Sequence, residues 1–232
     1  KYPRNSIFLK GLRHNTVEVY ECHVSLWEKT TNKGDTFGFS LTFLLRLFIA
    51  QIRLIFQYIF VTPKHDIIIV GYIGHLDMYL AKIFAYFGRK KLVFNPLISL
   101  YDTVISDRGY FNQSSLKAHF MRFLDRSACM MADMVLLDTE SQIQYFKYDL
   151  DLPKINFKRL FVGADDEVFY PVDSKQAEDK FDVMFFGKFI PLHGIRKIIE
   201  AANILRHKID IKFTLVGMGQ LRYEIEYRIN EL

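Results

Sequence analysis

The chain has 232 residues and a formal net charge of +5, and 50% of its residues are hydrophobic. This length can hold one large domain or two smaller ones, and the apolar content excludes a disordered chain. The positive charge permits a partner that carries phosphates, whether a nucleotide, a nucleic acid or an anionic lipid surface. Cys22 and Cys129 lie far apart without metal-ligand spacing. Neither a disulfide framework nor a zinc site is therefore expected, and a reducing cytoplasm is the simplest compartment.

The amino-terminal part carries no signal peptide pattern, because KYPRNSIFLKGL lacks an uninterrupted apolar core. A short helix is expected from about Ser6 to Leu12, followed by a first strand over Thr16–Tyr20. The apolar segment 37–60 comes next and is long enough to span a bilayer, but polar side chains interrupt it.

In a helix over 37–60, Arg46, Ala50, Arg53 and Gln57 fall on one narrow stripe and leave a wide apolar face. Two interpretations stay open. The helix either packs against the sheet of its own domain, or dips into a membrane interface with its arginines near lipid phosphates.

Short apolar runs alternating with helix-period segments then predict parallel strands joined by crossover helices. We expect strands at Asp66–Val70, Lys91–Phe94, Met134–Leu137 and Arg159–Val162. Helices are expected over Met78–Phe87, over Ser115–Met131 and from Thr139 onward, with an irregular segment from Asn95 to Phe111.

A polar stretch, YPVDSKQAEDK, separates this half from a second βαβα pattern. Strand Asp182–Phe186, helix Ile195–Arg206, strand Ile211–Val216 and a helix from about Leu221 make up that pattern. The predicted division is a domain over 1–172, a linker over 173–180 and a partial domain over 181–232. We expect the chain to be a fragment, because the first half lacks an opening strand and the second is short.

In open parallel sheets, ligands bind at the loops that follow the carboxyl ends of the strands. In the second half, Gly187 lets the chain turn, Lys188 supplies a cation, and His193 precedes a helix that begins near Gly194. These groups can neutralise a diphosphate. The alternative is a solvated lysine, a capping histidine and glycines that only shape the turn.

Three further groups are candidates. His75, the candidate catalytic residue, follows a strand in GYIGHLD after two glycines that admit a ligand, although a lone histidine is often structural. Asp102, Asp107 and Arg108 lie in the irregular segment, where an Asp–Arg pair can also simply order the loop. Gly217 and Gly219 form a G-x-G turn after a strand, which many α/β folds contain. No dinucleotide fingerprint, P-loop or serine-nucleophile elbow occurs, and no basic and aromatic stripe indicates nucleic acid.

Four stretches in order resemble glycosyltransferase family 4, the retaining enzymes of GT-B fold that use nucleotide-activated sugars. They are ADMVLLDTE, VGADDEVFYP, FFGKFIPLHGIRKIIEAANIL and FTLVGMGQLRYEI. The resemblance implies an α/β, GT-B-like fold with a Rossmann-type N-terminal domain and the beginning of a second Rossmann-type domain. It also implies that a paired-glutamate motif follows Leu232, so the fragment itself is expected to be inactive.

Carried over by position, the family's diphosphate-contacting Arg and Lys become Lys188 and His193. Lysine keeps the charge but loses the bidentate fork of arginine, and histidine is only partly cationic near neutral pH. Asn95 stands where the family often has a histidine, and His75, one loop earlier, is expected to take over its role on the acceptor side.

The resemblance therefore implies transfer of a hexose-type unit from a UDP- or GDP-sugar to a glycan, lipid or small-molecule acceptor. Retention of configuration, no required metal and no cofactor beyond the donor are expected, with a cytoplasmic location at the inner face of the membrane. Two alternatives stay open: another GT-B enzyme such as a nucleotide-sugar epimerase, and a non-catalytic or membrane-docked binding module.

Overall fold

The computed structural model describes residues 3–26, 41–171, 181–208 and 210–232. The chain divides into two compact units, residues 1–105 with 110–169 and residues 106–109 with 170–232. The linker predicted over 173–180 and the first four residues of the apolar segment 37–60 lie outside the described residues. Each unit is described by itself below.

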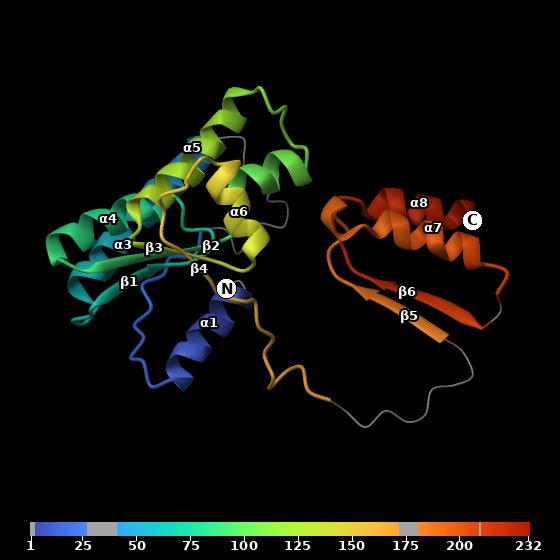
Figure 1. Cartoon of the computed structure of the whole chain (residues 1–232), viewed down its shortest axis with the longest axis horizontal. Coiled ribbons are helices and arrows are strands. Elements are labelled where there is room, and N and C mark those ends of the chain that lie inside the picture. Colours follow the sequence, from blue (N-terminus) through green and yellow to red (C-terminus); the bar gives the residue numbers. More distant parts are fainter. Residues whose placement is uncertain (1–2, 27–40, 172–180, 209) are drawn as a thin grey trace. The chain divides into compact units, whose positions relative to one another are not determined.

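The first unit is built on a parallel four-stranded sheet (Figure 1). Its strands are β1 (Ile67–Val70), β2 (Lys91–Leu97), β3 (Met134–Leu137) and β4 (Phe157–Arg159), and each pairs with the next in chain order. Such an order requires a crossover between successive strands, which the intervening helices supply. The predicted α/β class with a parallel, Rossmann-type sheet is confirmed.

The three crossover helices are α4 (Asp77–Gly88), α5 (Leu116–Met131) and α6 (Glu140–Tyr148). Their buried apolar faces meet the strands in one core, which includes Met78, Leu92, Phe94, Val135 and Phe146. Ser115 and Thr139 cap α5 and α6, since each hydroxyl accepts a backbone N–H three residues ahead.

Among the described residues, two more helices belong to the first unit, α1 (Pro3–His14) and α3 (Leu41–Phe60). Figure 1 shows α1 on the opposite side of the sheet from α4 and α5. The strand predicted over Thr16–Tyr20 is wrong, because the described residues after Thr16 form no ladder. This segment instead runs along α3, where Gln57 Nε2 donates to the carbonyl of Glu21 at 3.4 Å.

Two boundaries differ from the prediction. β2 continues through Leu97 and is followed by a π-helix over Asp102–Asp107, within the segment expected to be irregular. β4 ends at Arg159, three residues before its predicted end. Its partner β3 stops at Leu137, so Phe161 and Val162 leave the sheet and are exposed despite their apolar side chains.

The second unit is a parallel pair, β5 (Phe181–Phe186) with β6 (Ile211–Val216). Helices α7 (Ile195–Leu205) and α8 (Arg222–Glu231) lie on one side of this pair (Figure 1). The core between them is formed by Phe189, Ile195, Ile199, Leu221 and Ile225. The βαβα pattern predicted for this half is observed, with boundaries within one residue.

Candidate functional site

The carboxyl edge of the four-stranded sheet gathers the polar side chains predicted for the first unit. His75 lies in the turn between β1 and α4, and only 1% of its surface is exposed. Its ring packs edge-on against Phe94, with 5.0 Å between the ring centroids. With so little exposed surface, His75 contacts mainly neighbouring protein groups.

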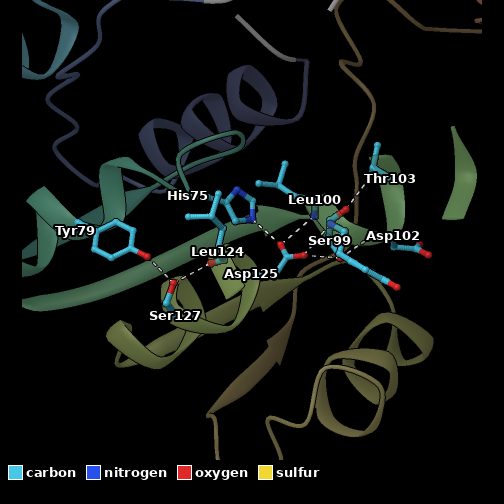
Figure 2. A network of polar contacts seen from close by, with 10 residues as sticks. His75, Tyr79, Ser99, Leu100, Asp102, Thr103, Leu124, Asp125 and Ser127 are labelled. Carbon is cyan, nitrogen blue, oxygen red and sulfur yellow. Dashed lines mark hydrogen bonds and ion pairs between the residues drawn. The ribbon is translucent and has the colours of Figure 1, made fainter. Parts of the chain in front are cut away.

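The neighbour of His75 is Asp125, a fully buried aspartate on α5 (Figure 2). His75 Nε2 lies 3.0 Å from Asp125 Oδ1, which is ion-pair distance. The direction is poor for a hydrogen bond, and neither ring nitrogen has a hydrogen-bond partner among the described residues. The contact is therefore a close approach between the ring and the carboxylate rather than a directed hydrogen bond.

Asp125 organises the loop that follows β2. Its carboxylate accepts hydrogen bonds from the Ser99 hydroxyl at 2.7 Å and from the Leu100 and Tyr101 N–H groups at 2.9 Å each (Figure 2). A carboxylate that satisfies three donors fixes the backbone it contacts. The entry to the π-helix, where Asp102 begins, is thereby held against α5.

Asn95 is another buried polar residue at this edge. Its Oδ1 accepts from Arg4 Nε at 3.1 Å and from Arg4 Nη2 at 3.0 Å, and Arg4 also donates to the Leu160 carbonyl. Burial lowers the pKa of Arg4, and Asp138 opposes that effect. The N-terminal turn of α1 is thus tied to the ends of β2 and β4.

Several buried polar atoms at this edge have no protein partner within the described part of the chain. They are Arg4 Nη1, Asn5 Oδ1, His75 Nδ1 and Asn95 Nδ2. Buried polar atoms are normally satisfied by protein, water or ligand, so such a group marks a place where a polar molecule can bind. This supports the carboxyl edge as a candidate site.

Two titratable side chains flank this edge. Burial raises the pKa of Tyr145 on α6 to about 12, with a further contribution from Asp102, so its phenol stays protonated at neutral pH. Asp77 is the first residue of α4, whose N-cap position is held by Leu76. Burial raises the pKa of Asp77, and the hydrogen bond from Gln51 partly offsets this.

Of the remaining residues predicted for the acceptor side, Asp107 and Arg108 form an ion pair. Arg108 Nε lies 2.9 Å from Asp107 Oδ2, and both side chains are largely buried. This agrees with the interpretation that the pair orders its loop. A role in acceptor binding stays a prediction for Asp102, Asp107 and Arg108.

In the second unit, the loops after β5 and β6 are pressed together at the carboxyl edge. The Gly187 N–H donates to the Val216 carbonyl at 3.0 Å, and the Phe189 N–H donates to the Met218 carbonyl at 2.9 Å. A Cβ atom at Gly217 would lie 1.9 Å from the Gly187 carbonyl oxygen. Gly219 meets the Phe189 backbone in the same way, so these glycines permit a close approach between the two loops.

The loop after β5 continues into a 3₁₀ turn over Pro191–His193 and then into α7. His193 Nδ1 lies 2.7 Å from the Lys188 carbonyl oxygen. Because a carbonyl only accepts, Nδ1 carries the proton and Nε2 is left for another partner. The structure therefore brings together Gly187, Lys188 and His193, with the helix N-terminus beside them.

Gly194 differs in detail from its predicted role. It occupies the N-cap of α7 with φ 61°, and its N–H donates to the Pro191 carbonyl at 3.0 Å. The helix proper begins at Ile195, and it is the first turn of a helix that leaves N–H groups without intrahelical partners. An anion here would meet α7 rather than the Gly194 N–H itself.

A pocket lies elsewhere in the first unit. It has a volume of about 380 Å³ and is lined mostly by apolar atoms of α1 and of the segment after β4. Arg4 is its charged member, and none of the residues predicted for a site lines it. Within the described ranges, no group of three or more His, Cys, Asp or Glu side chains is placed to hold a metal ion.

The sequence interpretation missed Asp125 and Arg4. Asp125 lies in LDRSA, in an amphipathic helix, where an aspartate ordinarily faces solvent. Arg4 lies in a charged N-terminal stretch and contacts Asn95 across 91 positions. Neither contact leaves a local signal in the sequence.

No family model and no curated protein matches this chain. Among solved structures, it is similar to the crystal structure of Arabidopsis thaliana UGT89C1 complexed with UDP-L-rhamnose. The TM-score is 0.46 and the sequence identity is 15%, over 94% of this chain. The match spans 59% of the length of that protein.

Proposed function

We propose that this chain is part of a glycosyltransferase of GT-B fold, which transfers a sugar from a nucleotide-sugar to an acceptor. The observation that carries the proposal is the loop arrangement in the second unit. Three glycines bring the turns after β5 and β6 into contact, and Lys188 and His193 lie where the chain enters α7. This arrangement suits the binding of a diphosphate. The four stretches that resemble glycosyltransferase family 4 favour a nucleotide-sugar as the molecule that carries it.

The chemistry assigned to this loop is stabilisation of the leaving diphosphate. Negative charge develops on the diphosphate as the glycosidic bond breaks, and cationic donors placed there lower the barrier. Lys188 supplies a full charge. His193 offers Nε2, which is a hydrogen-bond donor to a phosphate oxygen when the ring is protonated, because Nδ1 is held by the Lys188 carbonyl.

The carboxyl edge of the first unit is proposed to receive the acceptor. Unsatisfied atoms of Arg4, Asn5, His75 and Asn95 offer polar partners to a hydroxyl-bearing molecule. In this proposal His75 orients Asp125 and the loop before Asp102. Retention of the anomeric configuration and independence of added metal complete the proposal, with UDP- or GDP-sugar as donor and a glycan, lipid-linked or small molecule as acceptor.

The test is a nucleotide titration with the chain and its variants. We expect UDP or GDP to bind, and Lys188→Ala to weaken that binding roughly ten- to a hundredfold, the range for a lost hydrogen bond to a charged group. The matched control is Lys212→Ala, an exposed lysine near the amino end of β6, which should leave binding unchanged.

A second substitution tests the other basic residue. His193→Gln removes the ring that offers Nε2 to a phosphate oxygen, so it should also weaken nucleotide binding. The diphosphate assignment is wrong if neither Lys188→Ala nor His193→Gln weakens nucleotide binding, or if the chain binds neither UDP nor GDP. Product analysis of the whole protein, with and without an acceptor, then distinguishes transfer from epimerisation.

A further inference from the structure

The surface that remains unexplained is the outer face of α3. This helix is long and apolar enough to cross a membrane by length and composition, yet little of it is buried within the unit. Its contacts with the rest of the unit run along one stripe that includes Phe43 and Ala50. The large side chains on the opposite side, among them Leu44, Leu45, Phe48, Ile52, Ile55 and Phe56, are exposed.

The exposed face is continuous and has a charged margin. At about 100° per residue, Leu44 to Phe60 cover roughly 160° of the helix circumference without a charged side chain. Arg46 and Arg53 lie together along one margin, and α3 contains no acidic residue. An apolar face bordered by arginines fits the boundary between lipid acyl chains and anionic headgroups.

The packing of α3 on α4 sets the direction of the α3 axis relative to the rest of the unit. Gln51 Nε2 donates to Asp77 Oδ1 at 2.6 Å, and the rings of Tyr58 and Phe84 stack with 3.9 Å between centroids. Tyr58 follows Gln51 by seven residues in α3, and Phe84 follows Asp77 by seven residues in α4. The two helices therefore run parallel, side by side. The adjacent side of α4 packs in the main core of the unit.

This attachment argues against a spanning orientation. A helix that crossed the bilayer would take Arg46 and Arg53 toward the hydrocarbon centre, where charged side chains are costly. It would also bring α4, with the part-buried Gln51–Asp77 pair, into the hydrocarbon region. A helix that lies flat keeps the arginines at the headgroups and immerses only the exposed face.

The apolar surface extends onto α4. Ile83 and Phe87 are exposed, on the side of α4 that faces neither its core residues nor its contact with α3, and Phe87 has 81% of its surface exposed. Single exposed hydrophobic residues are common on soluble proteins, whereas a contiguous apolar surface over two helices marks an interaction site.

We propose that the outer face of α3, continued by Ile83 and Phe87, docks on an anionic lipid bilayer with the helix lying in the plane of the interface. The cytoplasmic leaflet carries such a negative surface potential. The proposal does not depend on glycosyl transfer, because it rests on α3 and α4 alone.

The experiment is flotation of the whole chain with vesicles of phosphatidylcholine, pure or mixed with phosphatidylglycerol. We expect binding to the mixed vesicles and weaker binding to the neutral ones. The double variant Phe48→Glu, Phe56→Glu should reduce partitioning into both at least tenfold. The matched control is Tyr223→Glu, Tyr227→Glu, two exposed aromatics on α8, which should bind as the wild type does.

A second variant isolates the charge. Arg46→Gln, Arg53→Gln should lower binding to mixed vesicles roughly five- to thirtyfold and leave neutral vesicles unaffected, since each basic residue near a charged surface contributes about fivefold. Both variants alter exposed positions, and circular dichroism should show the wild-type melting curve.

Three results would overturn the proposal. The first is equal flotation of the wild type and the Phe48→Glu, Phe56→Glu variant. The second is resistance of bound protein to alkaline carbonate, which would indicate a spanning helix. The third is a dimer, seen by light scattering, that this variant dissociates while vesicles bind neither form, which would assign the face to a second copy of the chain.

Discussion

Asp125 shows at the residue scale how one buried side chain sets the geometry of a loop. Its carboxylate satisfies the Ser99 hydroxyl and two successive backbone N–H groups, at Leu100 and Tyr101. These donors are buried or part-buried, so little water can replace the carboxylate if it is lost. The cost of leaving buried donors unpaired exceeds the net gain of forming the hydrogen bonds.

We therefore expect Asp125→Ala to lower the free energy of unfolding by about 3 kcal/mol, as urea denaturation would measure it. Asp166→Ala is the control, because its side chain is 96% exposed and should change stability by less than about 0.5 kcal/mol. A loss below about 1 kcal/mol for Asp125→Ala would mean that the loop finds other acceptors.

The residue scale also shows where sequence interpretation succeeds and fails. Gly187, Lys188 and His193 lie within seven positions, and their clustering in the structure follows from local spacing that the sequence displays. His75 and Asp125 are 50 positions apart, and only the parallel pairing of β1 with β2 and the packing of α5 bring them together. The burial of His75 likewise depends on residues that no local pattern identifies.

At the scale of elements, the sequence displays the apolar run of a strand but not its ladder partner. The predicted bounds of Met134–Leu137 and Ile211–Val216 are confirmed. Thr16–Tyr20 has a strand-like pattern, with Val17 and Val19 alternating, but no described strand pairs with it. A strand needs a ladder partner, and its own side chains do not reveal whether one is present.

The contact between α3 and α4 predicts a pH dependence. Burial raises the pKa of Asp77 in the folded chain, so the folded state holds that proton more tightly than the unfolded state does. Stability from this group is therefore highest below the ordinary aspartate pKa of 3.8 and declines as pH rises through the raised value.

Asp77→Asn keeps an oxygen to accept from Gln51 and has no proton to lose. We expect it to remove this decline and to make the chain more stable at pH 7 relative to pH 4 than the wild type, measured by urea midpoints across that range. Gln51→Glu should act oppositely, since it places a second carboxylate beside Asp77. An unchanged pH profile for Asp77→Asn would show that water reaches the carboxyl group.

On the scale of the whole molecule, the two units have separate cores. Phe146 belongs to the core of the four-stranded sheet and Ile225 to that of the β5–β6 pair, and these cores share no residue. The sequence anticipated two βα patterns from the polar stretch between them. The sequence could not predict that residues 106–109 belong to the second unit, because that assignment depends on contacts between residues distant in the chain.

Separate cores predict separate local stability. Ile225→Ala should cost about 2–5 kcal/mol and speed hydrogen exchange in peptides from β5 and β6, with little change in β2 and β3. Phe146→Ala should do the reverse. Exchange that rises throughout the chain in either variant, followed by mass spectrometry, would show that the units unfold as one.

The close approach of Gly187 and Gly217 has a consequence for motion. The carbonyl of one glycine leaves no room for a side chain on the other, and backbone hydrogen bonds from Gly187, Phe189 and Leu221 join the two turns. A displacement of either turn must carry the other with it. A molecule that binds beside His193 would therefore be sensed at the start of α8 as well, so that the two helices of this unit respond to one occupant together.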